Sequence, residues 1–174
     1  MMYNNNSHER RYEITLAFLK EHISQEARIL DLGVENPLSK LMQEAGYEVK
    51  NTFGEDLDED QSALKTNSYE VLTAFEIFEH LLNPYTVLKA CQAPKIVISV
   101  PLRLWFSTAY RSKTDLRDRH YHEFEDWQLD WLLEKCGYRI TARKQWAHPV
   151  NKLGIRPILR RFTPRYYLVC AEKF

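Results

Sequence analysis

Glycine is scarce in this sequence. Five of its 174 residues are glycine, about 3% where ~7% is usual, so few positions suit a positive φ or a close approach of the backbone to a ligand. Cysteine is scarce as well: Cys91, Cys136 and Cys170 are odd in number and far apart. This arrangement favours buried thiols in a reducing compartment over a disulfide framework or a zinc site.

Long hydrophobic runs and net charge are also missing. No apolar run approaches the ~18 residues of a membrane-spanning helix, and the opening residues MMYNNNSHERR lack the apolar core of a signal peptide. We therefore expect no membrane span and a cytoplasmic location. The 24 basic side chains balance the 24 acidic ones, so no overall field draws the protein to nucleic acid, which is the least favoured partner.

Charge is nevertheless unevenly distributed along the chain. Five of the six residues at 55–60 are acidic, whereas 139–165 contains eight basic residues and no acid. Such runs usually form solvated surfaces. The basic stretch also suits a phosphate or an anionic lipid surface, and both interpretations stay open.

Hydrophobic patterning predicts an α/β fold in a single domain over residues 1–174. Short apolar runs typical of buried strands lie at 28–33, 47–53, 69–75 and 95–100, and helical spacing marks 11–23, 37–45 and 84–91. A further helix is expected to bury Phe124, Trp127, Trp131, Leu132 and Cys136, followed by strands at 138–146 and 166–172. Strands that alternate with helices indicate a doubly wound, mostly parallel sheet with helices on both faces.

Four segments in this order resemble the class I S-adenosylmethionine-dependent methyltransferases, particularly the small bacterial methyltransferase-domain type. They are ILDLG at 29–33, SYEVLTAFEIFEHLL at 68–82, IVISVP at 96–101, and HEFE at 122–125 leading into a helix and CGY at 136–138. The resemblance implies a Rossmann-like, seven-stranded sheet whose last strand, 166–172, is antiparallel. It also implies S-adenosylmethionine as cofactor and a small-molecule acceptor, with O-methylation slightly favoured. Residues 1–27 would form an N-terminal helix, 28–100 the cofactor-binding half and 101–174 the acceptor-side half.

By the same resemblance, the first and third strands end at the cofactor, which places Asp31, Gly33, Phe75 and Glu76 beside it. The family pattern Asp/Glu-x-Gly-x-Gly-x-Gly is incomplete, because Glu35 and Pro37 stand at the second and third glycine positions. The Glu35 carboxylate either crowds the cofactor or is recruited to its amine. The alternative is a non-catalytic binding module that keeps the fold.

The family also ends its second strand with an acid that holds the ribose hydroxyls. Here either Asn51 replaces that acid or the strand extends to the acids at Glu55 and Asp56. Asp58 would lie where the family's adenine-contacting acid lies. The loop before 69–75 is short, so we expect the family's second helix to be lost or reduced to a turn.

The segment EIFEH contains the candidate chemical groups. Its spacing predicts Glu76, Glu79 and His80 on one face of a short helix, and a later loop contains His120, His122 and Glu123. Glu79, His80 and His122 are the candidate catalytic residues for removing a proton from a hydroxyl acceptor. The same set, with Glu76, resembles the metal site of small-RNA 2′-O-methyltransferases; a divalent metal is possible but not favoured. In the purely structural alternative, Glu76 caps, Glu79 is exposed and His80 packs against the sheet.

Aromatic and basic residues alternate over 102–121. This pattern predicts a lid over the acceptor, with rings for an aromatic or lipid group and basic side chains for a phosphate or carboxylate. Two alternatives remain, namely aromatic side chains buried in the core among solvated charges, and a surface for RNA or another single-stranded nucleic acid.

Overall fold

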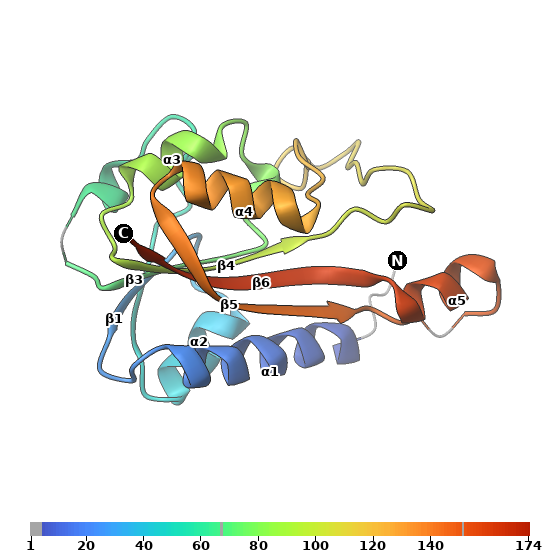
Figure 1. The fold of residues 1–174 in the computed structure, drawn as a ribbon, viewed down its shortest axis with the longest axis horizontal. Helices are drawn as coiled ribbons and strands as arrows, with labels where there is room; N and C mark the ends of the chain where they lie inside the picture. Colours follow the sequence, from blue (N-terminus) through green and yellow to red (C-terminus); the bar gives the residue numbers. More distant parts are fainter. Residues whose placement is uncertain (1–4, 67, 151) are drawn as a thin grey trace.

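A computed structural model describes residues 5–66, 68–150 and 152–174 (Figure 1). Its strands form one six-stranded sheet in the order β2-β1-β3-β4-β6-β5. They are β1 (Arg28–Asp31), β2 (Glu48–Asn51), β3 (Val71–Phe75), β4 (Lys95–Pro101), β5 (Tyr138–Ala147) and β6 (Pro164–Lys173). β1 to β4 pair in parallel, and β6 is antiparallel to both β4 and β5. The expected doubly wound, mostly parallel sheet with an antiparallel last strand is confirmed.

Helices cover both faces of the sheet. α1 (Asn5–His22) and α2 (Pro37–Glu44) lie on one face, and α3 (Pro84–Ala90) and α4 (Asp126–Lys135) on the other (Figure 1). Successive strand residues point to opposite faces, so Ile29 joins the α1–α2 core and Leu30 joins the α3–α4 core. Because both faces are buried, the inner strands are mostly apolar, with Asp31, Thr73 and Ser99 as buried polar exceptions.

The connection between β2 and β3 is reduced, as the short loop indicated. Its described residues contain one 3-10 turn, η1 (Ser62–Lys65), and no strand. The expectation of seven strands is therefore wrong: the sheet has six, and β2 becomes an edge strand.

The expected buried face of α4 is confirmed for Phe124 and Cys136, which are buried, and for Leu132, which packs against the core, but it is wrong for the two tryptophans. Leu129 and Leu133 are buried, whereas Trp127 and Trp131 are largely exposed and contact each other at a ring-centroid distance of 4.7 Å. Residues four apart share a helix face, so the leucine pair and the tryptophan pair occupy opposite sides. The helix therefore packs its leucine pair, and not its tryptophan pair, against the sheet.

A last helix, α5 (Ile155–Phe162), connects β5 to β6 and projects beyond the end of the sheet (Figure 1). Pro101 pairs with Tyr166, near the start of β6. α5 therefore lies at the edge of the sheet where the parallel strands have their carboxyl ends. None of the helices in the described part of the chain is long and apolar enough to cross a bilayer.

Candidate functional site

The candidate site lies where the strand order reverses, between β1 and β3. From β1 the chain moves outward to β2, and it then returns to form β3 on the other side of β1. Ligands of open α/β sheets bind outside the carboxyl ends of the strands at such a point. The register pairs Asp31 with both Asn51 and Thr73, so the ends of β1, β2 and β3 meet at one edge.

Asp31 is the buried centre of this edge. Its carboxylate accepts hydrogen bonds from Ser39 Oγ at 2.8 Å, Thr73 Oγ1 at 2.6 Å and Asn51 Nδ2 at 3.0 Å. Burial raises the pKa of Asp31, and the three hydrogen bonds oppose that rise. The carboxylate thus ties β1, β2, β3 and α2 together, which orients the turn that follows it.

Gly33 forms that turn in a left-handed conformation, with φ of 94°. Its N–H donates to Thr52 Oγ1 at 2.8 Å, and a Cβ at this position would lie 3.6 Å from Ile77 Cδ1. Glu35, two residues later, is half exposed and lies 3.6 Å from the Lys40 ammonium of α2. Its carboxylate is therefore directed to a surface ion pair.

Asn51, the last residue of β2, and Glu55 lie beside the turn after β1 and a neighbouring cavity. Asn51 donates from its amide to Asp31 and to the carbonyl of Gly33 at 3.2 Å. Glu55 accepts from the backbone N–H of Phe53 at 2.7 Å. A cavity of about 470 Å³ opens at the edge of β2, and Asn51, Phe53 and Glu55 line it.

Asp58 is directed away from that cavity. Its two carboxylate oxygens accept the backbone N–H groups of Leu82 at 2.7 Å and Asn83 at 2.8 Å. Asp56 in turn accepts the N–H of Asp58 at 3.0 Å. Asp58 therefore joins the acidic loop to the start of α3, whereas Glu55 and Asp60 are the acids that line the cavity.

At the end of β3, Phe75 packs against the α1–α2 core and the chain then turns sharply at Glu76. Glu76 is the non-glycine residue with positive φ, 56°, among those described. Its carboxylate accepts from Ser99 Oγ at 2.9 Å and lies 3.4 Å from the Arg11 guanidinium of α1. Burial raises the pKa of Glu76, and Arg11 and Ser99 counteract the rise. Such strained positions persist where surrounding contacts determine them, and they are common at functional sites.

The expected single helix face for Glu76, Glu79 and His80 is wrong. The chain forms only a short 3-10 turn, η2 (Phe78–His80), and Glu76 precedes it in the left-handed conformation. The purely structural alternative is wrong about Glu79 as well, since this side chain is 1% exposed rather than solvated. The backbone N–H groups of Tyr121 and His122 both bond the carbonyl of Glu79, at 2.7 and 3.2 Å, and fasten the later loop over the turn.

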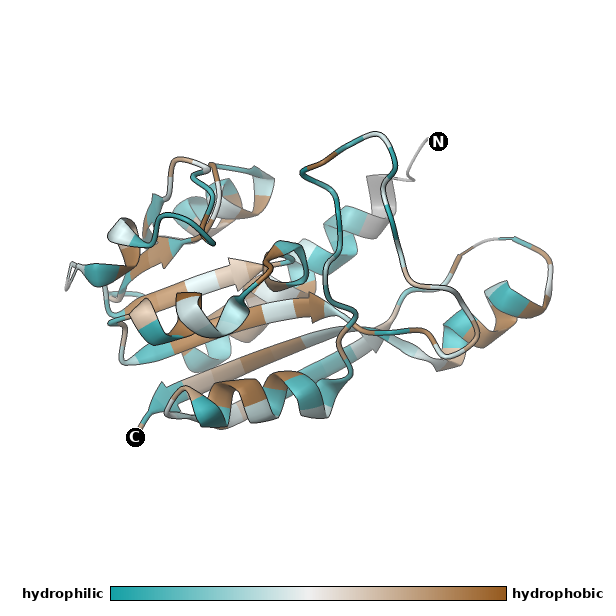
Figure 2. Cartoon of the chain, turned by 90° about the horizontal axis from the view of Figure 1, so that it is seen from above, coloured by the Kyte–Doolittle hydropathy of each residue, from teal (hydrophilic) through white to brown (hydrophobic). Residues whose placement is uncertain are grey.

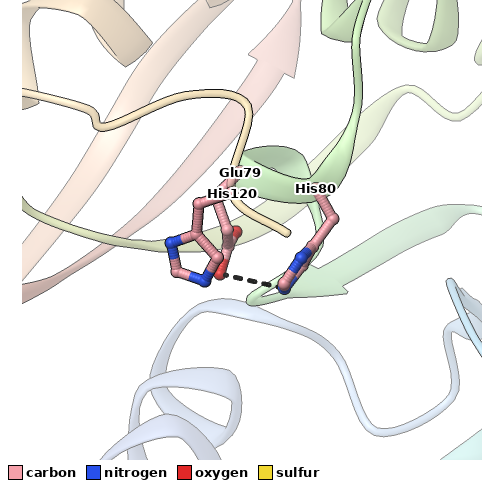
Figure 3. Close-up of side chains that lie close together, drawn as sticks. All are labelled: Glu79, His80 and His120. Atoms are coloured by element: carbon pink, nitrogen blue, oxygen red, sulfur yellow. Dashed lines mark ion pairs between the residues drawn. The ribbon is translucent and has the colours of Figure 1, made fainter. Parts of the chain in front are cut away.

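That loop brings His120, rather than His122, to Glu79 and His80 (Figure 3). One potential ligand atom from each of Glu79, His80 and His120 lies within 4.8 Å of the others. The rings of His80 and His120 meet edge-on with centroids 4.7 Å apart. His122 instead directs Nε2 to the carbonyl of Leu82 at 3.3 Å, and Glu76 stays with Ser99 and Arg11.

Two buried polar atoms in this group have unused hydrogen-bonding capacity. Across the described residues, Glu79 Oε2 and His120 Nδ1 are the buried side-chain atoms without a hydrogen-bond partner. Burial and the adjacent Glu76 carboxylate raise the pKa of Glu79 well above its usual range. Burial, with the charges of His80 and Arg165, lowers the pKa of His120 to about 4. Neutral imidazole is therefore the form of His120 at neutral pH.

The chain is similar to known proteins in its fold and not in its sequence. The sequence matches no protein-family model and no curated protein. Among solved structures, an S-adenosylmethionine-dependent methyltransferase from Archaeoglobus fulgidus is 18% identical; the match covers 93% of this chain and 94% of that one, with a TM-score of 0.59. One from Mesorhizobium loti is 14% identical over 90% of this chain and 96% of that one, with a TM-score of 0.55. Magnesium protoporphyrin IX methyltransferase from Synechocystis PCC 6803, solved with bound S-adenosylhomocysteine, is 11% identical over 100% and 89%, with a TM-score of 0.60.

The chain has the class I methyltransferase fold. The resemblance expected from the four sequence segments is confirmed at this level. Asp31, Gly33 and Glu76 lie at the edge of this sheet where the parallel strands have their carboxyl ends and the strand order reverses.

The group of Glu79, His80 and His120 fits a divalent metal ion. It supplies one carboxylate oxygen and two imidazole nitrogens, a mixed set that suits Zn²⁺, Mn²⁺ or Fe²⁺. His80 Nδ1 lies 3.0 Å from the carbonyl oxygen of Arg119. Because a carbonyl only accepts, Nδ1 carries the proton and Nε2 presents its lone pair toward Glu79. Metal-binding histidines are usually oriented by such a hydrogen bond.

The loop from 102 to 121 confirms the interpretation of buried side chains in part, and the lid over the acceptor stays a prediction. Leu104 is 4% exposed and belongs to the core, whereas Trp105 is 70% exposed. Arg165 donates from its guanidinium to the carbonyl of Leu102, at the start of the loop. The loop is thus anchored at both ends, by Arg165 and by Glu79, and presents Trp105 to solvent between them.

Proposed function

We propose that this protein is an S-adenosylmethionine-dependent methyltransferase acting on a small-molecule acceptor, with a metal-assisted acceptor site. One observation carries the proposal: the carboxylate of buried Glu79 and the imidazoles of His80 and His120 offer ligand atoms within 4.8 Å of one another at the carboxyl edge of a methyltransferase fold, and Glu79 and His120 each keep one buried polar atom without a hydrogen-bond partner. Burying such atoms without partners is costly, so their arrangement is explained best by a ligand.

The cofactor would lie along the ends of β1, β2 and β3. Gly33 has no side chain and a positive φ, so the backbone can approach a ligand closely there. Asp31 acts as a positioning residue, because its carboxylate is engaged by Ser39, Thr73 and Asn51. Glu55, which lines the cavity beside Asn51, is our candidate for the ribose hydroxyls in place of Asp56. Asp58, expected at the adenine, accepts the N–H groups of Leu82 and Asn83 instead. When bound, the cofactor supplies an electrophilic methyl group on its sulfonium.

The acceptor would be prepared by the group of Glu79, His80 and His120. Cation binding at this group would lower the pKa of an acceptor hydroxyl and so favour O-methylation. A metal-free alternative uses His80 Nε2, whose lone pair is exposed by the Nδ1–H bond to Arg119, as the proton acceptor. His120, with a pKa of about 4, is a weak base and suits a ligand role better. The geometry therefore favours the metal over the metal-free site.

Calorimetric titration with S-adenosylmethionine and S-adenosylhomocysteine tests the cofactor assignment. We expect binding of both, and about tenfold weaker binding by Glu55→Gln, since hydrogen bonds to charged groups contribute about 1.5–3 kcal/mol. Glu59→Gln is the matched control, an exposed acid in the same loop. If the protein binds neither compound, the proposal is contradicted and the non-catalytic module is favoured. The contacts that would support that module are Ile77 beside Gly33 and the donation of the Asn51 amide N–H groups to Asp31 and Gly33.

A further inference from the structure

α5 is strongly amphipathic. Its apolar residues, Ile155, Ile158, Leu159 and Phe162, are spaced three and four apart and share one face. The remaining surface of the helix contains Arg156, Arg160 and Arg161 and no acidic residue. The helix is therefore polarised into an apolar stripe and a cationic side.

The apolar stripe faces solvent instead of the core. Ile155 is 78% exposed, Ile158 56% and Phe162 82%, and the preceding Leu153 is also fully exposed. None of the residues of α5, all of which the structure describes, is buried. Figure 2 shows why: the helix, with its alternating hydrophobic and hydrophilic residues, extends away from the sheet and the other helices. Exposed apolar surface of this kind marks an interaction site.

The position of α5 relates it to the candidate site. Tyr166 pairs with Pro101 at the carboxyl end of β4, so the helix just before this strand lies at the edge that also holds Glu76 and Ser99. The guanidinium of Arg165 joins the exit of α5 to the loop after β4 through the carbonyl of Leu102. That loop adds Trp105, which is 70% exposed.

We propose that α5 is a membrane-surface helix that binds an anionic lipid bilayer in the plane of its interface. The apolar stripe would enter the boundary between headgroups and acyl chains, and the flanking arginines would pair with lipid phosphates. Charge complementarity favours an anionic lipid surface as the partner of this helix. The helix itself contains Arg156, Arg160 and Arg161 and no acid, and this local positive charge attracts an anionic surface.

The same features argue against two other occupants. A second copy of α5 would bring arginines against arginines, and like charges across an interface are repulsive. A nucleic acid would use the arginines, but it would leave the exposed stripe of Ile155, Ile158 and Phe162 without a partner. A lipid surface satisfies both the charge and the apolar area.

Bilayer binding through α5 turns the carboxyl edge of the sheet toward the membrane. The acceptor would then be an amphiphilic molecule whose polar head reaches this edge while its apolar part remains in the bilayer. This consequence rests on the proposed methyl transfer. The membrane binding itself does not, because it depends on α5 alone.

Co-sedimentation of the full chain with vesicles tests the binding without cofactor, so its result is separate from that of the cofactor titrations. We expect binding to phosphatidylglycerol–phosphatidylcholine vesicles at about 0.1 M salt and much weaker binding to pure phosphatidylcholine. Ile158→Glu with Phe162→Glu should abolish it, and each of Arg156→Gln and Arg161→Gln should weaken it about fivefold. Trp131→Glu is the matched control, because Trp131 is 65% exposed on α4.

These substitutions are at exposed positions, so circular dichroism should show unchanged folding. The proposal is overturned if anionic vesicles bring down no protein, or if the Ile158→Glu, Phe162→Glu variant sediments as wild type does. It is also overturned if the wild type self-associates in sedimentation velocity and these substitutions abolish that association. Retention on a single-stranded oligonucleotide that depends on Arg156 and Arg161 but not on Ile158 and Phe162 would likewise assign the helix to nucleic acid.

Discussion

The Nδ1–H of His80 donates to the backbone carbonyl of Arg119 at 3.0 Å. This one hydrogen bond connects the turn after β3 to the loop before α4, and it directs the Nε2 lone pair of His80 toward Glu79, whose Oε1 is 3.8 Å away. His120 follows Arg119 directly, so the same stretch of loop that orients His80 delivers the second imidazole. The hydrogen bond that holds the loop against the turn therefore also places the two imidazoles side by side.

Metal binding is expected to depend on His120 and not on His122. His120→Ala and Glu79→Gln should each weaken binding of Mn²⁺ or Zn²⁺ by at least about 100-fold, since removing a ligand costs no less than removing its supporting partner. Isothermal titration with the metal alone, in the absence of cofactor, measures this. His122→Ala is the control from the same loop, because His122 contacts the Leu82 carbonyl instead. Equal loss in both histidine variants would contradict the assigned ligand set.

The metal-free protein should lose stability in acid through His120. Its pKa of about 4 in the fold lies below the ~6.5 of an unfolded chain, so the unfolded state takes up the proton first. The stability contributed by neutral His120 is complete above pH ~6.5 and is lost as the pH falls toward 4. Because the ring is partly exposed, we expect a loss of roughly 1–2 kcal/mol.

Urea denaturation in chelator, from pH 7 to pH 4, measures that loss. His120→Gln should show a shallower decline than the wild type, because the substituted amide does not titrate. If the two stability curves are parallel over this range, His120 is not held neutral by its surroundings.

Glu79→Gln should stabilise the metal-free protein at neutral pH. Burial raises the pKa of Glu79 well above its usual range, so the folded state favours the protonated carboxyl. Its contribution is fully present below pH ~4.5 and is lost as the pH rises. The substituted amide stays neutral, and it can donate to His80 Nε2. Thermal unfolding of both proteins should show a gain for the variant at pH 7 that vanishes near pH 4; a loss at pH 7 would contradict the direction of this shift.

Gly33→Ala should destabilise the fold by about 1–2 kcal/mol, because φ at Gly33 is 94° and a side chain is strained there. Gly137→Ala is the matched control, since Gly137 has φ of 89° and no atom within 4 Å of an added Cβ. Both variants should lose similar stability in urea, but only Gly33→Ala should weaken binding of S-adenosylhomocysteine. Equal affinities in the two variants would show that the turn after β1 does not contact the cofactor.

Asp31→Asn should destabilise the protein by about 2–3 kcal/mol. The carboxylate accepts from Ser39, Thr73 and Asn51, and an amide at this buried position turns two N–H donors toward groups that already donate. The exposed Asp60 provides the control substitution Asp60→Asn, which should change the free energy of unfolding by less. Urea midpoints for the two variants measure the difference, and equal midpoints would contradict the central role of Asp31.

Local sequence determined most of the secondary structure. Apolar runs located the strands, and helical spacing from Pro37 located α2, to which the structure adds the Asn36 side chain as a cap that accepts the N–H groups of Leu38 and Ser39. Asn83 and Pro84 mark α3 in a similar way. These signals can be recognised in the sequence because each depends on residues within one turn or one strand. The ordered segments around Gly33 and Glu79 also indicated the fold, since each follows a strand whose end meets the same edge.

Only the tertiary structure decided which side chains meet at the site. Helical spacing predicted Glu76, Glu79 and His80 together, but the contacts of Glu76 with Ser99 and Arg11 hold it in a left-handed conformation outside the turn. His120 and His122 are equivalent in the sequence; the bonds from Tyr121 and His122 to the Glu79 carbonyl, about forty residues away in the chain, turn His120 inward. Periodicity reports contacts between near neighbours, whereas these positions follow from loop closure over long separations. For that reason the elements were predictable from the residues, and the composition of the site was not.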